Sequence, residues 1–166
     1  WDRFPPLTYK TFWNLLSLET TEKIKNLTGC SPLYPDIGLH GGGWHMHTEG
    51  GNLSVHLDYS THPKMNLQRK INLIIYLEEG YDSSWGGDLE LWSHNPDTKK
   101  PGHCVRSVEA KFNRAIIFDT TQNSWHGVPS KLKCPPGKAR KSFAVYYLTE
   151  LSNTAVDRFR AHYEQT

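Results

Sequence analysis

The stretch RKINLIIYLEEG, residues 69–80, determines the fold class. Side chains of a strand alternate between its two faces, so one face of this stretch is aliphatic throughout, at positions 71, 73, 75 and 77. The other face carries Asn72, Ile74 and Tyr76, and two of these need hydrogen-bond partners if they are buried. The stretch therefore predicts a strand with one core face. Its second face is either exposed to solvent or forms the wall of a polar pocket.

Short runs of the same kind follow one another along most of the chain. Runs rich in Val, Ile, Tyr, Phe and Trp alternate with clusters of Gly, Pro, Asn and Asp, which is typical of strands joined by turns. This pattern predicts strands at about 37–47, 52–57, 70–78, 88–92, 105–110, 115–120, 124–128 and 141–148. Many short strands in succession favour a mainly β fold, a double-sheet jelly roll or a barrel.

The first part of the chain follows a different period. Apolar residues between positions 9 and 27 recur at helical spacing, which predicts one or two helices that stop at Thr28-Gly29. A further short helix is predicted at 154–162. No repeat or linker divides the 166 residues, so we expect one domain, with helical support at 1–30 and a β core at 37–150.

Composition excludes several classes of partner. The net charge is only +2, so no general attraction to nucleic acid is expected, and the apolar runs are too short to cross a membrane. The three cysteines, Cys30, Cys104 and Cys134, form no CxxC pair, which argues against a disulfide framework or a cysteine zinc site. We therefore expect a cytoplasmic protein whose partner is a small molecule or a peptide. The oligomeric state is left open.

A candidate metal site begins in NLSVHLDYS, residues 52–60. His56 and Asp58 lie two residues apart and share one face of a strand. With nine histidines in the chain, such a pair also arises by chance, so it is weak evidence alone. His126, in NSWHGVPS, supplies a third candidate ligand. Two histidines and one carboxylate from different strands are typical of the facial triad of non-haem Fe(II) oxygenases.

A candidate anion anchor lies in GKARKSFAVYYLTE, residues 137–150. Arg140 and Ser142 share one face of a predicted strand, and a guanidinium with a hydroxyl can grip a carboxylate. The alternative is that Arg140 belongs to the basic run at 138–141 and is solvated.

Taken in order, these segments resemble the 2-oxoglutarate- and Fe(II)-dependent dioxygenases, and most of all their prolyl-hydroxylase-like branch. The resemblance rests on the HxD pair and on NLIIYLEEGYDSSWGGDLELW (72–92), FNRAIIFDTTQNSWHGVP (112–129) and RKSFAVYYL (140–148). It covers nearly everything from about Gly41 to Leu148. Four segments that agree in order and spacing make it specific.

The resemblance implies a double-stranded β-helix and a hydroxylase that uses Fe(II), 2-oxoglutarate and O2. It implies that His56, Asp58 and His126 hold the metal. It further implies that the distal carboxylate of 2-oxoglutarate is held by Arg140 and Ser142, with Tyr76 and Asn72 as further cosubstrate residues. Many collagen-type prolyl hydroxylases have a lysine where this chain has Arg140, which bears on the substrate rather than on the reaction.

The substrate is not identified by these motifs. A prolyl residue in a peptide or protein is expected, with a free amino acid or another small metabolite as the alternative. Trp44, His45 and Tyr59 are the predicted substrate contacts. Two other functions remain open on the residues alone: a zinc-dependent, cupin-like hydrolase built on the same three ligands, and a non-catalytic jelly-roll binding module.

Overall fold

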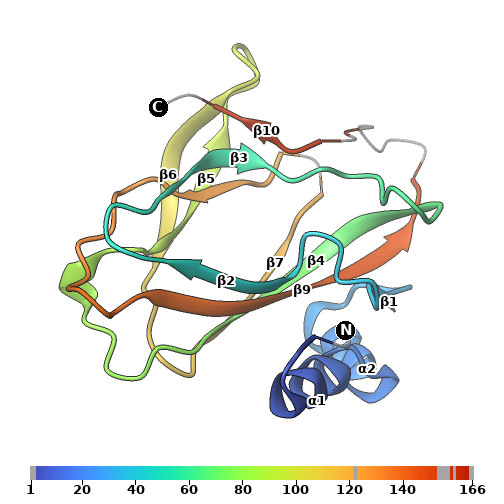
Figure 1. The fold of residues 1–166 in the computed structure, drawn as a ribbon. Coiled ribbons are helices and arrows are strands. Elements are labelled where there is room, and N and C mark those ends of the chain that lie inside the picture. The colour runs from blue at the N-terminus through green and yellow to red at the C-terminus, as the bar shows by residue number, and fades with distance from the viewer. Residues whose placement is uncertain (1–2, 122, 153–157, 159, 165–166) are drawn as a thin grey trace.

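Two antiparallel sheets face each other, and two helices cover the outer face of one of them (Figure 1). This computed structural model describes residues 3–121, 123–152, 158 and 160–164. The first sheet contains β1 (Tyr34–Pro35), β2 (Gly43–His47), β4 (Leu67–Tyr76), β7 (Ala115–Asp119) and β9 (Arg140–Glu150). The second contains β3 (Leu53–Leu57), β5 (Leu89–His94), β6 (Pro101–Val108), β8 (Trp125–Val128) and β10 (His162–Tyr163). The predicted jelly-roll class is confirmed.

All eight predicted strands are present, with shifted ends. The largest shift is in the first, which starts at Gly43 because the chain before it turns. The buried Asp36 carboxylate accepts hydrogen bonds from the backbone N–H groups of Gly38 and His40, at 3.1 Å each. Gly41, at φ +73°, then reverses the chain into β2. The additional strands β1 and β10 have only two residues each, too few for an alternation pattern.

The helical prediction at the N-terminus resolves into two helices, α1 (Pro6–Leu15) and α2 (Leu18–Thr28). The hydroxyl of Ser17 caps the start of α2 by accepting from the backbone N–H of Thr20, and Gly29 in the left-handed conformation ends it. Of the helix predicted at 154–162, residues 154–157 and 159 lie outside the described residues. His162 belongs to a strand instead.

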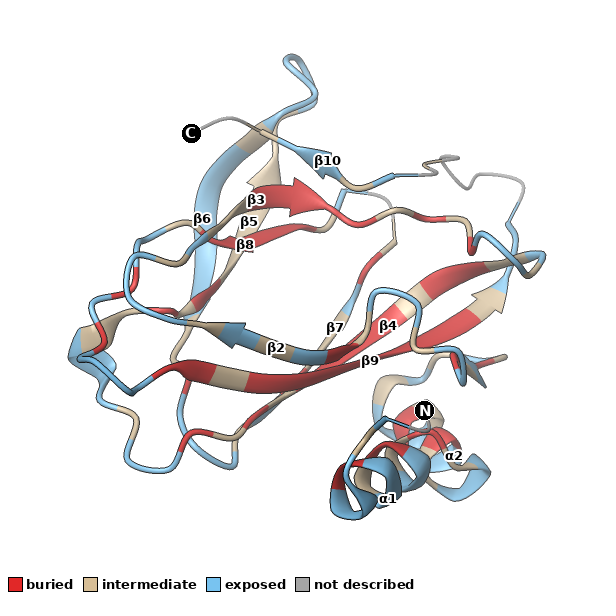
Figure 2. Cartoon of the chain, in the orientation of Figure 1, coloured by how far each residue is buried: buried red, intermediate tan, exposed pale blue. Residues whose placement is uncertain are grey.

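The central strands β4 and β9 are buried on both faces (Figure 2). Their outer face packs on the helices through Phe12, Leu16 and Ile24, which meet Leu73 and Phe143. The hydroxyl of Tyr147 in β9 donates a 2.6 Å hydrogen bond to the carbonyl of Leu15, which ties α1 to the sheet. The inner face looks toward the second sheet, so the polar positions of β4 and β9 line the interior rather than a wet surface.

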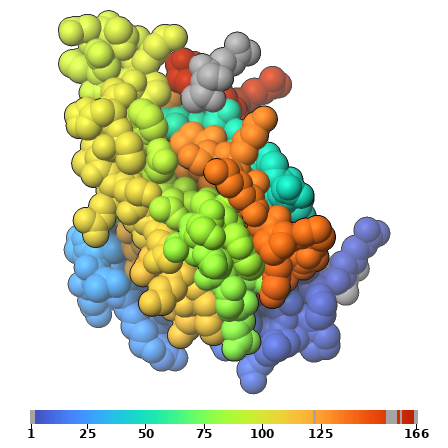
Figure 3. Space-filling view, turned by 90° about the vertical axis from the view of Figure 1, so that its left-hand side faces the viewer, coloured from blue at the N-terminus to red at the C-terminus, as the bar shows by residue number. Residues whose placement is uncertain are grey.

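The second sheet ends in an exposed hairpin. β5 and β6 pair antiparallel and project from the body, and β6 is exposed along most of its length (Figures 2 and 3). The segment 93–103 is the turn of this hairpin together with its flanking strand residues. The segment 81–87 contains a single 3-10 turn at Ser83–Trp85. No helix in the described part of the chain has the length and apolar character needed to span a membrane.

Candidate active site

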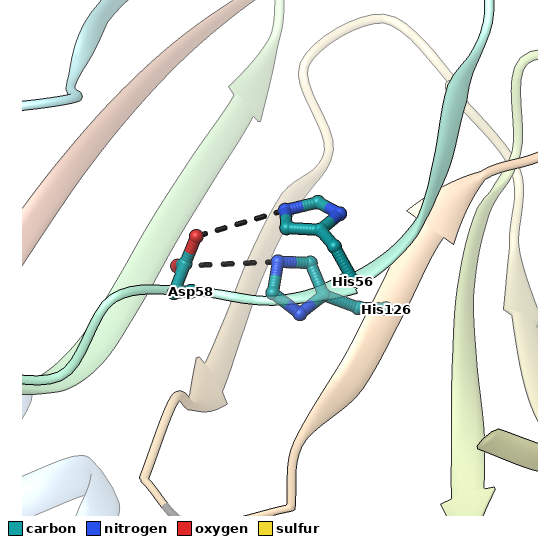
Figure 4. A group of neighbouring side chains, drawn as sticks. All are labelled: His56, Asp58 and His126. Carbon is teal, nitrogen blue, oxygen red and sulfur yellow. Dashed lines mark ion pairs between the residues drawn. The ribbon is translucent and has the colours of Figure 1, made fainter. Parts of the chain in front are cut away.

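Three side chains converge between the two sheets, on the inner side of the second (Figure 4). His56 in β3 and His126 in β8 are directly opposite each other in the antiparallel ladder. Asp58 follows the end of β3. Its Oδ1 lies 3.6 Å from Nε2 of His56, and its Oδ2 lies 4.0 Å from Nε2 of His126. All three side chains are buried, and their ligand atoms lie within 4.8 Å of one another.

The backbone sets the orientation of both imidazoles. Nδ1 of His56 is 2.9 Å from the carbonyl oxygen of Ser54, and Nδ1 of His126 is 2.8 Å from that of Ser124. A carbonyl oxygen only accepts, so each Nδ1 carries the proton and each Nε2 lone pair is free to bind a metal. Burial also lowers the pKa of His126, which keeps its ring neutral at pH 7. The histidines are therefore ready to act as ligands.

Asp58 is held as a carboxylate despite its burial. Burial by itself raises the pKa of an acid, but the neighbouring His56, His126 and Arg69 outweigh it and keep the pKa of Asp58 well below its usual range. Nη1 of the buried Arg69 lies 3.2 Å from Oδ2 of Asp58. That oxygen has no aligned hydrogen-bond donor among the described residues, so it remains available to a metal ion.

Arg69 is itself fixed on both faces and at its tip. Its guanidinium carbon lies 3.5 Å from the centres of the Tyr59 and Tyr146 rings, a double cation–π contact. Its Nη2 donates a 2.7 Å hydrogen bond to the carbonyl of His40, which also accepts from the hydroxyl of Tyr59. The turn that precedes β2 thus fixes the position of the Arg69 guanidinium, which faces the carboxylate of Asp58.

The sequence did not reveal Arg69 because of a β-bulge. Strict alternation from Ile71 places Arg69 on the helix side of β4, but the pairing of β4 with β9 shifts register between these two residues. The bulge turns Arg69 to the inner side, where it lines the same cavity as Asn72. The intervening Lys70 pairs with Asp119. Bulges have no reliable signature in a single sequence.

Removal of the Arg69 cation should weaken metal binding without removing a ligand. We expect Arg69→Met to lower the affinity for Co(II) by about 10- to 100-fold, the usual cost of losing an outer partner of a metal ligand. A chelator-competition titration measures this affinity. Arg106→Met, at an exposed arginine of β6, is the matched control. Wild-type Co(II) affinity in a folded Arg69→Met variant would show that Arg69 does not position Asp58.

The triad shares one cavity, of about 380 Å³, with the predicted anion anchor. Arg140 is buried; its Nε donates to the carbonyl of Gly87 at 2.7 Å and its Nη2 donates to the hydroxyl of Tyr76 at 3.2 Å. No described carboxylate lies within ion-pair distance of Arg140. A buried guanidinium without an acid partner is costly, so the cavity suits an anionic ligand.

Two further buried polar atoms of the cavity have no partner in the described part of the chain, and one of them, the hydroxyl of Ser142, can donate to an anion. The hydroxyl of Ser142 and the Oδ1 atom of Asn72 are buried and have no hydrogen-bond partner among the described residues. Buried polar atoms are nearly always paired in native proteins, so both await a partner inside the cavity. A dicarboxylate of the size of 2-oxoglutarate brings acceptors for the donors of Arg140 and Ser142, whereas Oδ1 of Asn72 needs a donor. The solvated alternative for Arg140 is wrong, because the side chain is 4% exposed.

The remaining predicted residues divide into two groups. His45 and Tyr59 line the cavity, and burial together with Arg140 lowers the pKa of His45, so its ring is neutral. Trp44 does not line the cavity: alternation along β2 turns it to the helix side, where its ring meets Phe143 at 4.3 Å. Tyr76 also lies outside the lining and braces Arg140 instead.

Besides Arg69, the cavity wall contains other residues that were not predicted as site residues, among them His47, Ala161 and Tyr163. His47 lies opposite Arg140 in the pairing of β2 with β9. Alternation from His45 could have found it, since the two histidines are two residues apart in one strand. Ala161 and Tyr163 come from the last described segment, and no pattern in the sequence connects that segment to the site.

Known proteins support the same assignment. The family model of the 2OG-Fe(II) oxygenase superfamily matches residues 42–148. Prolyl 3-hydroxylase OGFOD1 of Xenopus laevis is 30% identical over 79 residues, which are 48% of this chain and 15% of that protein. A crystal structure of a prolyl 4-hydroxylase from Phytophthora capsici matches with a TM-score of 0.58 and 21% identity, over 90% of this chain and 44% of that one.

The chain therefore spans less than half the length of either relative. Both relatives are prolyl hydroxylases by name, which agrees with the branch that the sequence motifs resemble, and the structural match supports the fold. The matched family is one of Fe(II)- and 2-oxoglutarate-dependent enzymes, and its model covers the triad strands, most of the cavity lining and most of β9. This chain belongs to the 2OG-Fe(II) oxygenase superfamily.

Proposed function

We propose that this chain is an Fe(II)- and 2-oxoglutarate-dependent dioxygenase that hydroxylates a C–H bond, with a prolyl residue of a peptide or protein as its substrate. One observation carries the proposal. A single cavity holds a His-Asp-His cluster and a buried arginine that has no acid partner within the described part of the chain. In this proposal the catalytic part is the β core at 37–150, and the helices at 1–30 support β4 and β9 from outside.

His56, Asp58 and His126 would hold the iron. Two imidazole nitrogens and one carboxylate are the donor set of non-haem Fe(II) oxygenases, and three ligands leave open positions for cosubstrate and O2. The backbone contacts at Nδ1 fix both rings, and Arg69 keeps Asp58 in place and charged. When bound, iron and 2-oxoglutarate supply the oxidation of a C–H bond by O2, with succinate and CO2 as coproducts.

Arg140 and Ser142 would hold the distal carboxylate of 2-oxoglutarate. The Arg140 guanidinium is already aimed by Gly87 and Tyr76, so little side-chain entropy is lost when the anion binds. Burial raises the pKa of Tyr76, so its hydroxyl stays protonated. Asn72 offers a further polar atom to a bound ligand. Arg140 and Ser142 are buried, which strengthens their polar contacts relative to the same contacts in water.

The prolyl substrate is supported by the names of the two relatives and by the surroundings of the triad. His45 and Tyr59 line the cavity, and Tyr59 lies next to Asp58 in the chain. Burial raises the pKa of Tyr59 to about 12, so it presents a neutral phenol. A free amino acid or small metabolite remains the second candidate. A zinc-dependent hydrolase gives no role to Arg140 and Ser142. Neither nucleic acid nor a membrane is a partner in this proposal.

An anaerobic titration tests the proposed function. Fe(II) and 2-oxoglutarate together should produce a weak visible charge-transfer band, which neither Zn(II) with 2-oxoglutarate nor Fe(II) with succinate produces. In air, a proline-containing peptide should stimulate succinate formation and gain one oxygen atom, whereas the same peptide with alanine in place of proline should not. Tight zinc binding and no band with iron would refute the oxygenase. A band together with stimulation by a free amino acid alone would refute only the peptide substrate.

A further inference from the structure

The last described segment of the chain lies beside β3, the strand that carries the candidate ligand His56 and ends just before Asp58. β10 pairs antiparallel with β3, with His162 opposite Leu57 and Tyr163 opposite His56 (Figure 1). The backbone N–H of Glu164 donates a 3.1 Å hydrogen bond to the carbonyl of Val55. The segment therefore forms the edge of the second sheet at the level of the triad.

Tyr163 covers one candidate ligand. Its ring stacks on the imidazole of His56, with the ring centres 4.8 Å apart and the planes 24° from parallel. Tyr163 lines the cavity and is 53% exposed, so it reaches from the interior to the solvent. An aromatic ring in this position limits the space beside His56 through which a substrate group can approach.

Arg158 attaches the same segment to the other candidate ligand. Its backbone N–H donates to Oγ of Ser60 and its carbonyl accepts from the N–H of Ser60, both at 2.8 Å. Its Nε donates to the backbone carbonyl of Asp58 at 3.0 Å. β10 has only two residues and makes few ladder bonds of its own, so these contacts account for much of its attachment.

We propose that Tyr163 is a specificity-determining residue, whose ring sets the size of the group that reaches the triad, and that Arg158 is the positioning residue that holds this wall in place. The inference rests on the proposed function, because it assumes a metal at the triad. Loss of the ring opens the cavity on the side of His56 and leaves the three ligands intact. Loss of the Arg158 side chain removes the hydrogen bond between this segment and the backbone of Asp58. It should also open the cavity beside His56, but to a smaller degree than loss of the Tyr163 ring.

Two ligands of different size test the wall on the Co(II)-loaded protein. Imidazole and 4-phenylimidazole both bind an open metal position, and the visible spectrum of Co(II) reports their affinity. We expect Tyr163→Ala to improve the affinity for 4-phenylimidazole relative to imidazole by about tenfold, the effect of adding room for an apolar group in a pocket. Tyr163→Leu should give a smaller gain in the same direction, and it serves as the second variant if the alanine protein does not fold.

Matched controls separate the wall from general effects. Tyr163→Phe keeps the ring and should keep the wild-type ratio of the two affinities. Tyr34→Ala removes a tyrosine of comparable exposure, 40%, from β1 in the other sheet. This variant should also keep the wild-type ratio of the two affinities. Arg158→Gln should raise the ratio toward that of Tyr163→Ala, whereas Arg160→Gln, at an exposed neighbour, should not.

Each outcome decides one proposal. An unchanged ratio in both Tyr163→Ala and Tyr163→Leu, with Co(II) bound, would overturn the wall and leave the proposed function standing. A wild-type ratio in Arg158→Gln would overturn the positioning role of Arg158. Failure of the wild-type protein to bind Co(II) would overturn the proposed function, and the inference with it.

Discussion

The His126→Ala variant should lose tight binding of divalent metal ions. His126 supplies one of three ligand atoms, and the remaining pair, His56 and Asp58, can only form a weak two-point chelate. Removal of an outer partner of a ligand already costs about 10- to 100-fold in affinity, so removal of a ligand itself should cost more than 100-fold. The affinity is measured by Co(II) titration against a competing chelator, and succinate formation should fall to background.

The control for this variant is a histidine outside the cavity. His103→Ala removes an exposed ring from β6 and should leave Co(II) affinity unchanged. Because His126 is buried, a thermal melt of the metal-free proteins must first show that His126→Ala is folded. A folded variant with wild-type Co(II) affinity would remove His126 from the site.

The Arg140→Gln variant should bind metal normally but lose the cosubstrate. Its guanidinium is the one charged group aimed at the anion in the proposed complex, and glutamine keeps a hydrogen-bonding side chain without the charge. Truncation of one partner in a buried charge pair costs about 2–5 kcal/mol, so the affinity for 2-oxoglutarate should fall by about 100-fold. Calorimetry on the Co(II)-loaded protein measures this affinity in the absence of turnover.

The neighbouring Lys138 provides the control. It belongs to the same basic run, but its side chain is 46% exposed, and its Nζ lies 3.5 Å from Oε1 of Glu78. Lys138→Gln should bind 2-oxoglutarate as the wild type does. If Arg140→Gln also retains full affinity, the carboxylate anchor lies elsewhere in the cavity, and the unpaired hydroxyl of Ser142 becomes the first candidate.

Alternation along single strands predicted the parts of the fold and site that depend on local geometry. The period of two placed Arg140 with Ser142, and Asn72 with Tyr76, on the inner side of β9 and β4. It also brought His56 and Asp58 to one face. These predictions succeeded because a regular strand constrains the directions of its side chains, whatever it packs against.

Where the backbone departs from regularity, the same rule failed or was silent. The bulge between Arg69 and Ile71 reversed the face of Arg69, and it depends on the pairing of β4 with β9, which are far apart in the chain. The turn set by local hydrogen bonds of Asp36 shortened the first predicted strand. Trp44 was wrongly predicted as a substrate contact for a different reason, because regular alternation in β2 turns it to the helix side.

Strand periodicity and residue type are local properties, so they were enough to predict the class of the fold, the three candidate metal ligands and the candidate carboxylate anchor. The folded domain was needed to show that the candidate ligand atoms face one another, that Arg69 is clamped between two tyrosines beside Asp58, and that Tyr163 covers His56. The first and third of these facts follow from the pairing of β3 with β8 and β10, and the second follows from the bulge in the pairing of β4 with β9. Strand partners are selected by packing over the whole domain, which no single segment encodes.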